Sequence, residues 1–476
     1  MVVSHFAEPA VTVVKQATRQ RYQSVRPHAR ALLPELFPQA PPRPTAAQGL
    51  GARRVVLTGI ALVTGAVVLL LRPEGRSPLT TIYAEDLTVY IVQALASPWH
   101  LFASYAGYLQ LLPRLIGQLA ALLPLRDAAA VFAISGAITA SAAAAFVFHA
   151  SAGHIRSAGL RALLAAAVLL LPVAPIELVD NGVNTTWYLL FALFWAVLWR
   201  PRTRRGMAVA AFIGFITVAS NPLALTLAPL LAVRIAALRR VREHAVTAGW
   251  IAGLLLQAPV ILTARASRVN ETARPIHVLG FVAHDVVLPA LGWHLDWWLQ
   301  SVVGRNGAAL LVGVVFAVVL GAVVVATSAR VRLFTAAALV TGLLLATVAA
   351  TLTRWVTTKP VHFRVEPGSR YTTLPIFLIE ATAIVAVDWV VRRAGEREVS
   401  AGERSRTAVA PVVALTLALS AGWITDFRYP GGRAAAPVWS QVTAKWLASC
   451  RPGPDDTIRV PSTGAGYVAI RCSSLR

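Results

Sequence analysis

The chain has 476 residues, of which 57% are hydrophobic and only 14% are charged, and its net charge of +23 comes almost entirely from arginine. Since soluble globular proteins carry about 25% charged residues, this composition excludes an ordinary soluble domain and indicates a membrane protein. The basic residues are scattered between apolar runs and form no single patch, so we expect no nucleic-acid partner. A bias towards Ala, Val and Arg with very little Lys is typical of a bacterium such as an actinobacterium.

The first 54 residues are polar, rich in arginine and, from Pro34 to Pro44, rich in proline. A cleavable signal peptide needs an apolar core, and none of the required length precedes Val55. Segments with little apolar content cannot bury enough surface to fold. We therefore expect residues 1–54 to form a disordered basic tail.

Apolar segments predict about eleven membrane-spanning helices, because a bilayer core of about 30 Å requires roughly 20 apolar residues in helical form. The predicted spans are residues 55–71, 128–150, 160–178, 185–199, 206–220, 222–238, 247–263, 307–327, 331–352, 372–392 and 407–424. We expect an all-α polytopic membrane domain over residues 55–424, followed by a small C-terminal segment over 425–476.

Short connections between these spans are dense in arginine, notably at 200–205, 239–242 and 392–406. Under the predicted count they fall on one side of the membrane together with the basic N-terminal tail. Because Lys and Arg in short loops mark the cytoplasmic side, we expect a cytoplasmic N-terminus and an extracytoplasmic C-terminus in a bacterial plasma membrane.

The first outer loop, residues 72–126, is predicted to contain two amphipathic surface helices. In Asp86–Ser97 the apolar residues recur at helical spacing. The second, Gly107–Pro124, carries leucines on one face and a polar stripe on the other. That stripe consists of Gln110, Arg114 and Gln118. Treating this segment as a span would place the arginine-rich connections outside, so a helix on the outer membrane surface is the better interpretation.

The acidic pair Glu85-Asp86 opens the first of these surface helices. A carboxylate held at the membrane boundary could accept a proton from an acceptor hydroxyl as a general base. The structural alternative is a helix cap, since acidic groups at a helix N-terminus are stabilised by the helix dipole.

Basic residues are dense in the outer loop at 353–371, where the positive-inside bias disfavours them. They are Arg354, Lys359, Arg364 and Arg370. Arginine makes bidentate contacts with phosphate, so this loop could hold the phosphate of a lipid-linked donor. Contact with anionic lipid headgroups is the alternative interpretation.

The link Asp180–Trp187 joins the outer ends of two spans and is rich in polar side chains. Asp180, Asn181 and Asn184 could line a cavity, or they could form a tight polar turn with a helix cap. In the C-terminal segment, Cys450 and Cys472 are either bridged by a disulfide, which an extracytoplasmic location would favour, or free thiols.

Neither a zinc-ligand spacing nor a nucleotide-binding glycine pattern is present in the sequence. No metal site can be identified from the sequence, and the need for a divalent cation stays open. ATP-driven transport by this chain alone is not expected.

The arrangement resembles the GT-C superfamily of membrane glycosyltransferases. The residues that carry the resemblance are Glu85-Asp86 after the first span, Tyr105-Ala106-Gly107-Tyr108, Leu112-Pro113-Arg114, and Ser369-Arg370-Tyr371 followed by Pro375. In such enzymes the first outer loop carries two juxtamembrane helices and an acidic catalytic residue. They transfer a sugar from a polyprenyl-phosphate donor at the outer leaflet. The resemblance covers roughly residues 55–424.

The resemblance implies a role for several residues of this chain. Asp86 corresponds to the catalytic base, with Glu85 as the alternative or a helper. Arg370, with Arg364 as a second candidate, corresponds to the donor phosphate contact, and Arg114 is expected to contact donor or acceptor. The expected acceptor-side cavity residues are Asp180, Asn181, Asn184 and Tyr108. The C-terminal segment is much smaller than the periplasmic domains of many members.

The expected function is therefore transfer of a sugar from a polyprenyl-phosphate donor to a glycan or protein acceptor of the cell envelope. A transporter or flippase of lipid-linked intermediates is one alternative. It predicts ionisable residues deep within several spans, and few are visible in the sequence. A non-catalytic membrane protein of envelope assembly is the other alternative.

Overall fold

The computed structural model describes residues 32–40, 51–263, 274–352, 369–396, 401–428, 434, 436–450, 457–462 and 466–472. The longer helices of the bundle are α2 (Gly51–Leu70), α5 (Ala128–Ala150), α6 (Ala158–Leu170), α8 (Thr185–Leu198), α9 (Arg204–Ser220), α10 (Ala228–Ala237), α11 (Ala245–Thr263), α13 (Trp293–Ala326), α14 (Ala329–Leu352), α15 (Thr373–Glu396) and α16 (Ala401–Thr425). Shorter helical elements connect them: η1 (Leu33–Leu36), η5 (Leu125–Asp127), η6 (Ser151–Gly153), α7 (Ala174–Glu177), η7 (Pro222–Leu227), η8 (Val241–His244), α12 (Pro275–Phe281), η9 (Val282–Val287), η10 (Pro289–Leu291) and η11 (Ser369–Thr372).

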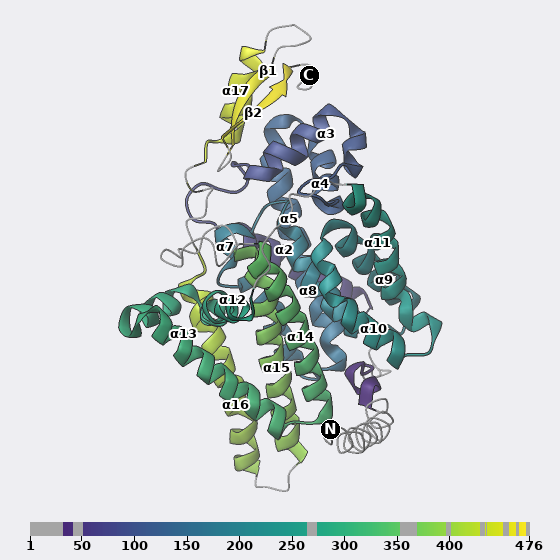
Figure 1. Ribbon diagram of the computed structural model, residues 1–476, viewed down its shortest axis with the longest axis vertical. Coiled ribbons are helices and arrows are strands. Elements are labelled where there is room, and N and C mark those ends of the chain that lie inside the picture. The colour runs from purple at the N-terminus through teal and green to yellow at the C-terminus, as the bar shows by residue number, and fades with distance from the viewer. Residues whose placement is uncertain are drawn as a thin grey trace, which may run out of the picture.

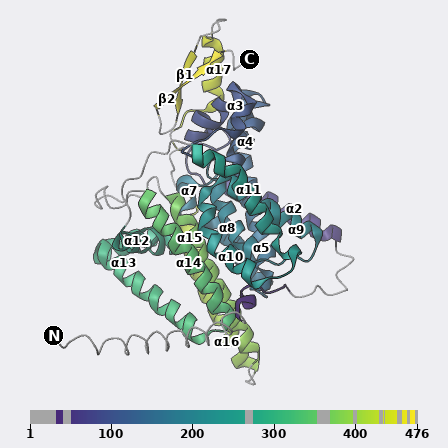
Figure 2. The same cartoon turned by 45° about the vertical axis from the view of Figure 1, so that its right-hand side comes forward.

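The molecule is elongated along the direction of its long helices (Figure 1). The segment between α2 and α5 lies at one end of the bundle, which we call the loop end, next to the C-terminal tail. We call the opposite end, where α14 begins and α15 finishes, the Arg-rich end. Helix α13 lies on the side of the bundle away from α9 and α11, as both views show (Figures 1 and 2).

Five helices in the described part of the chain are long and apolar enough to cross a membrane. They occupy Leu125–Gly153, Val241–Thr263, Trp293–Ala326, Ala329–Thr351 and Arg370–Glu396. Shorter helices stand at the other predicted spans, and those other than α9 are apolar. The chain is therefore a mostly helical, membrane-spanning protein.

Helix α8 is the centre of the bundle. All fourteen of its residues are buried, and they are apolar on every face apart from the two threonines that open it. A helix that is hydrophobic all round must be covered on all sides. Helices α5, α9 and α15 supply that cover, and rings such as Phe191 and Phe377 stack with centroids 4.8 Å apart.

Proline alters the helical geometry of two predicted spans. The predicted span 160–178 consists of α6 and the short α7, because Leu171 precedes Pro172 and adopts an extended ψ of 121°; the proline ring disfavours helical geometry in the residue before it. The predicted span 222–238 begins as the 3-10 helix η7 at Pro222 and continues as α10.

The prediction of a disordered tail over residues 1–54 is wrong for residues 51–54, which begin α2, and for residues 32–40. Leu36 and Phe37 are buried, and η1 contacts α10 and α14. The Arg234 guanidinium lies 5.7 Å from the centre of the Phe37 ring. The apolar pair Leu36-Phe37 anchors this segment at the Arg-rich end.

The two helices predicted in the first loop are present. Residues 86–96 form η3 (Asp86–Ile91, a π-helix) and α3 (Val92–Ala96), and the second helix is α4 (Leu111–Ala121), after the short η4 (Pro98–Phe102). Two of the three residues of the polar stripe of α4 face the protein, and Gln118 is half-buried. Gln110 and Arg114 are buried, while Leu115 and Leu119 are exposed.

The C-terminal tail contains α17 (Trp439–Ser449) and an antiparallel hairpin of β1 (Thr457–Ser462) and β2 (Gly466–Arg471), in which Thr457 pairs with Arg471. This hairpin adds β structure to a fold expected to be all-α. Cys450 and Cys472 form a disulfide, as one of the two interpretations of the sequence had it. Trp439 joins the tail to the first loop, because its backbone N–H donates to the Thr80 carbonyl at 2.8 Å and its indole N–H donates to the Leu125 carbonyl at 2.6 Å.

Candidate functional site

An ion pair at the loop end joins two segments that are far apart in sequence. The Nη1 atom of Arg370, in η11, lies 2.7 Å from a carboxylate oxygen of Glu177, the last residue of α7. Glu177 is buried, whereas the Arg370 side chain keeps 28% of its surface exposed. The buried carboxylate therefore fixes a guanidinium that remains accessible.

Glu85 from the first loop belongs to the same charged cluster. Burial raises the pKa of the Tyr83 phenol, the Glu177 and Glu85 carboxylates raise it further, and the Arg370 guanidinium opposes them. The charges of Glu85, Glu177 and Arg370 thus all act on the Tyr83 phenol. Glu85 is half-buried, and its carboxylate has no hydrogen bond or ion pair with any described residue.

Two more tyrosines of the first loop border this cluster. Tyr105 and Tyr108 pair through their backbones around a tight turn, in which Ala106 and Gly107 both take a positive φ. Burial and the Glu85 carboxylate raise the pKa of Tyr105, and Arg370 opposes that shift. Burial raises the pKa of the Tyr108 phenol to about 12, although the Arg370 guanidinium acts to lower it. Both phenols therefore stay protonated at neutral pH and can donate hydrogen bonds.

Tyr371, next to Arg370, closes the cluster on the side of α8. Its ring lies edge-on to Trp187 with centroids 5.1 Å apart, and the Arg370 guanidinium is 5.6 Å from its centre. We call the group Tyr83, Glu85, Tyr105, Tyr108, Glu177, Arg370 and Tyr371 the loop-end cluster. It combines one guanidinium, two carboxylates and four phenols.

Asp86 has a different environment from its neighbour Glu85. Its side chain is fully buried, and its two oxygens accept backbone N–H bonds from Gly182 at 2.9 and 3.1 Å and from Val183 at 3.0 Å. Both carboxylate oxygens are therefore already engaged by the protein backbone. Asp86 therefore ties the first loop to the link after α7.

Gly182 allows this contact. A Cβ atom at this position would lie 2.6 Å from the Phe132 ring and 3.1 Å from the Asp86 carboxylate. Only glycine fits such a close approach between the link, α5 and the first loop.

The predicted cavity residues of the link are part of a tight, buried turn. Asn181 Nδ2 donates to the carbonyls of Glu177 and Val179 at 2.7 and 3.1 Å, and its Oδ1 accepts from the Asn184 N–H at 2.8 Å. Asn184 Nδ2 also donates to the Glu177 carbonyl at 2.8 Å. Asp180 is buried with a left-handed φ of 57°. These side chains shape the backbone that carries Glu177.

Arg114 is held within the first loop. One of its nitrogens donates to Gln93 at 2.8 Å and to the His100 carbonyl at 2.6 Å, and its guanidinium lies 6.0 Å from the centre of the Tyr90 ring. No described contact joins it to the loop-end cluster. Arg364 falls outside the described residues.

Two members of the cluster, Tyr83 and Glu177, were not predicted from the sequence. For Glu177 the available signal was a single acidic residue at the outer end of an apolar run, just after Pro175. Such positions are common, and only the fold pairs this one with Arg370. Among the described residues, no group of three or more His, Cys, Asp or Glu side chains is placed to hold a metal ion. No family model matches this chain, and no curated protein matches it in sequence.

Proposed function

We propose that this protein is a membrane glycosyltransferase of the GT-C type, with about eleven spans, a cytoplasmic N-terminus and its active site at the extracytoplasmic membrane surface of a bacterium. The donor is a polyprenyl-phosphate sugar, and the acceptor is a hydroxyl of an envelope glycan or protein. The observation that carries the proposal is the loop-end cluster, because it combines an accessible guanidinium with a carboxylate that has no partner among the described residues.

In the proposed reaction, the acceptor hydroxyl gives its proton to the Glu85 carboxylate while its oxygen attacks the anomeric carbon of the donor sugar. The bond between that carbon and the phosphate oxygen breaks, and the electron pair leaves with the lipid phosphate. Arg370 stabilises the negative charge that develops there. Glu85 is assigned the base role over Asp86, since the oxygens of Asp86 are occupied by backbone N–H groups.

Glu177 is assigned a positioning role for Arg370. A guanidinium carries five N–H donors, and the contact with Glu177 uses Nη1, so donors remain for a phosphate. The protonated phenols of Tyr105 and Tyr108 supply further hydrogen bonds to sugar or phosphate oxygens. This arrangement holds the cation in place before the donor binds, which reduces the reorganisation needed in the transition state.

The test compares Glu85→Gln with Glu74→Gln, an exposed carboxylate of the same loop, in membranes that contain equal amounts of folded protein. Transfer of radiolabelled sugar from a panel of polyprenyl-phosphate donors to envelope acceptors is measured. We expect Glu85→Gln to lower the rate by about 10²–10⁴-fold, as loss of a general base does, and Glu74→Gln to retain it. Equal rates for both variants, or no transfer by the wild type with any donor, would refute the proposal.

A transporter or flippase of lipid-linked intermediates is the second candidate, and one residue favours it. Glu380 is buried within α15, and both carboxylate oxygens have no hydrogen-bond partner among the described residues. It lies seven residues, or about 10 Å, beyond the start of the helix. Ionisable groups inside a membrane bundle often mark a transport path. Lipid-linked sugar movement across vesicles that is lost in Glu380→Gln, without sugar transfer, would establish this alternative.

A further inference from the structure

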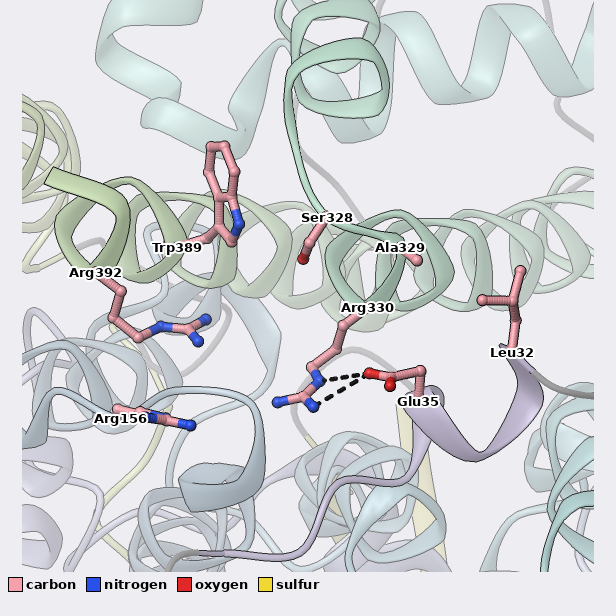
Figure 3. Close-up of a pocket in the computed structure, with 8 residues that line it drawn as sticks. All are labelled: Leu32, Glu35, Arg156, Ser328, Ala329, Arg330, Trp389 and Arg392. Carbon is pink, nitrogen blue, oxygen red and sulfur yellow. Dashed lines mark hydrogen bonds and ion pairs between the residues drawn. The ribbon is translucent and has the colours of Figure 1, made fainter. Parts of the chain in front are cut away.

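A pocket of about 380 Å³ opens at the Arg-rich end, far from the loop-end cluster. Four segments line it: η1, the connection before α6, the start of α14 and the end of α15 (Figure 3). Its lining residues are Leu32, Glu35, Arg156, Ser328, Ala329, Arg330, Trp389 and Arg392. Its volume lies within the range of small-molecule sites, about 300–1,000 Å³.

Three guanidinium groups dominate the chemistry of this pocket. Arg156 and Arg392 lie on one side, and Arg330 lies on the other, nearer to η1 (Figure 3). Arg392 Nε lies 3.0 Å from the buried Asp388 carboxylate. The guanidinium of Arg156 has no hydrogen bond or ion pair with any described residue.

Asp388 fixes the geometry of this side of the pocket. Besides holding Arg392, its other oxygen accepts the backbone N–H groups of Arg156 and Ser157 at 3.1 and 2.9 Å. The connection before α6 is thereby tied to the end of α15. The two guanidinium groups are presented by a backbone that is held in place, unlike arginines scattered along a solvated loop.

Glu35 brings a carboxylate of the protein itself against Arg330. One of its carboxylate oxygens accepts from Arg330 Nε at 3.3 Å and from Nη2 at 3.1 Å. Three guanidinium charges then face two carboxylates, Glu35 and Asp388, which leaves one unbalanced positive charge. The single charge matches a phosphate diester, and if Glu35 moves away two positive charges remain, which match a phosphate monoester.

We propose that this pocket binds a phosphate group, with Arg156 and Arg392 as its direct partners and Glu35 as an internal carboxylate that competes for Arg330. Arginine forks match the oxygens of phosphate. The group can belong to an anionic lipid headgroup or to a soluble phosphate compound. Two separate experiments distinguish these sources. This site is independent of the proposed transfer reaction.

The first experiment titrates inorganic phosphate into the full chain in detergent and follows the heat of binding. Arg156→Gln is the main variant, because this exposed side chain supports no described contact in the fold. Arg393→Gln is the matched control: it removes the same charge from the neighbour of Arg392, but its side chain is 59% exposed and it pairs with Glu396, outside the pocket.

We expect saturable binding that Arg156→Gln weakens by about tenfold or more, the loss typical of one charge-assisted hydrogen bond, and that Arg393→Gln leaves unchanged. Glu35→Gln is expected to change the affinity for phosphate in the opposite direction, because it removes the competing carboxylate. It should tighten phosphate binding by about threefold or more.

The second experiment uses bilayer discs of phosphatidylcholine with an increasing fraction of phosphatidylglycerol, and counts the phosphatidylglycerol molecules retained by the protein in native mass spectrometry. Retention that falls in Arg156→Gln but not in Arg393→Gln identifies a lipid headgroup as the ligand. Phosphate binding in detergent without such retention identifies a soluble ligand. The proposal would be overturned if the protein neither binds phosphate nor retains phosphatidylglycerol, or if Arg156→Gln and Arg393→Gln lose binding equally.

Discussion

Glu85 and Asp86 are adjacent acidic residues with opposite environments. The sequence offers both as bases, since each lies at the start of the same predicted helix. Asp86 is buried against the backbone of Gly182 and Val183, while Glu85 is half-buried beside Arg370 and the tyrosines. A one-residue step around a helix turns a side chain by about 100°, so neighbours routinely face different surroundings.

Asp86→Asn is expected to lower stability more than it lowers the intrinsic rate. The amide has one acceptor oxygen and no charge, so the N–H groups of Gly182 and Val183 lose charge-assisted partners. The expected cost is about 1–3 kcal/mol. The measurement is thermal unfolding in detergent, together with the transfer rate per folded molecule. A variant that melts like wild type but has no activity would return the base role to Asp86.

Helix α4 illustrates what an amphipathic pattern leaves undecided. The spacing of its polar residues correctly predicts a helix with two faces. It does not say which face meets the protein. The buried face carries Gln110, whose side chain accepts from the Tyr90 hydroxyl, and Arg114, whose partners lie in the preceding segment. Leu115 and Leu119 on the other face are left exposed, as they are for a helix whose outer surroundings are lipid.

A lipid contact for this face can be tested with single cysteines, because Cys450 and Cys472 are bridged and the described chain has no free thiol. A spin label on Leu119→Cys should be relaxed by oxygen dissolved in the bilayer more than by a water-soluble nickel complex. The same label on Glu74→Cys, an exposed position of the same loop, should show the reverse. A label at residue 119 that responds mainly to nickel would place α4 in water.

At the scale of the whole molecule, the tail and the first loop form one outer layer over the bundle. Trp439 and Trp446 pack with first-loop residues such as Leu87 and Ile116. Arg76 adds a hydrogen bond to the Ala436 carbonyl at 2.9 Å. The tail therefore helps to fix the loop that carries Glu85.

Opening the Cys450–Cys472 bridge is expected to loosen the tail but not the bundle. The bridge closes a loop with a sequence separation of 22, for which chain entropy predicts a stabilisation of about 3 kcal/mol. The variant Cys450→Ser with Cys472→Ser should therefore exchange the amides of β1 and β2 about 100-fold faster, with α5 and α8 unchanged. Unchanged exchange in the hairpin would show that packing alone holds it.

The sequence by itself determined the helical, membrane-spanning character of the protein, the position of most helices and the two helices of the first loop. These features depend on composition and on local periodicity, which a single segment carries within itself. The burial of segment 32–40 could not be predicted in this way. Leu36 and Phe37 form too short an apolar run to indicate burial, and only the contacts with α10 and α14 explain it.

Only the tertiary structure decided which residues meet. Glu177 and Arg370 are separated by 193 positions, and Asp86 and Gly182 by 96, so no local pattern relates them. The same holds for Arg156, Arg330 and Arg392, which the sequence distributes over separate connections. A pairing of charges across such separations depends on how helices pack in three dimensions, and each partner alone has the same sequence signature as an ordinary charged residue at the end of a helix.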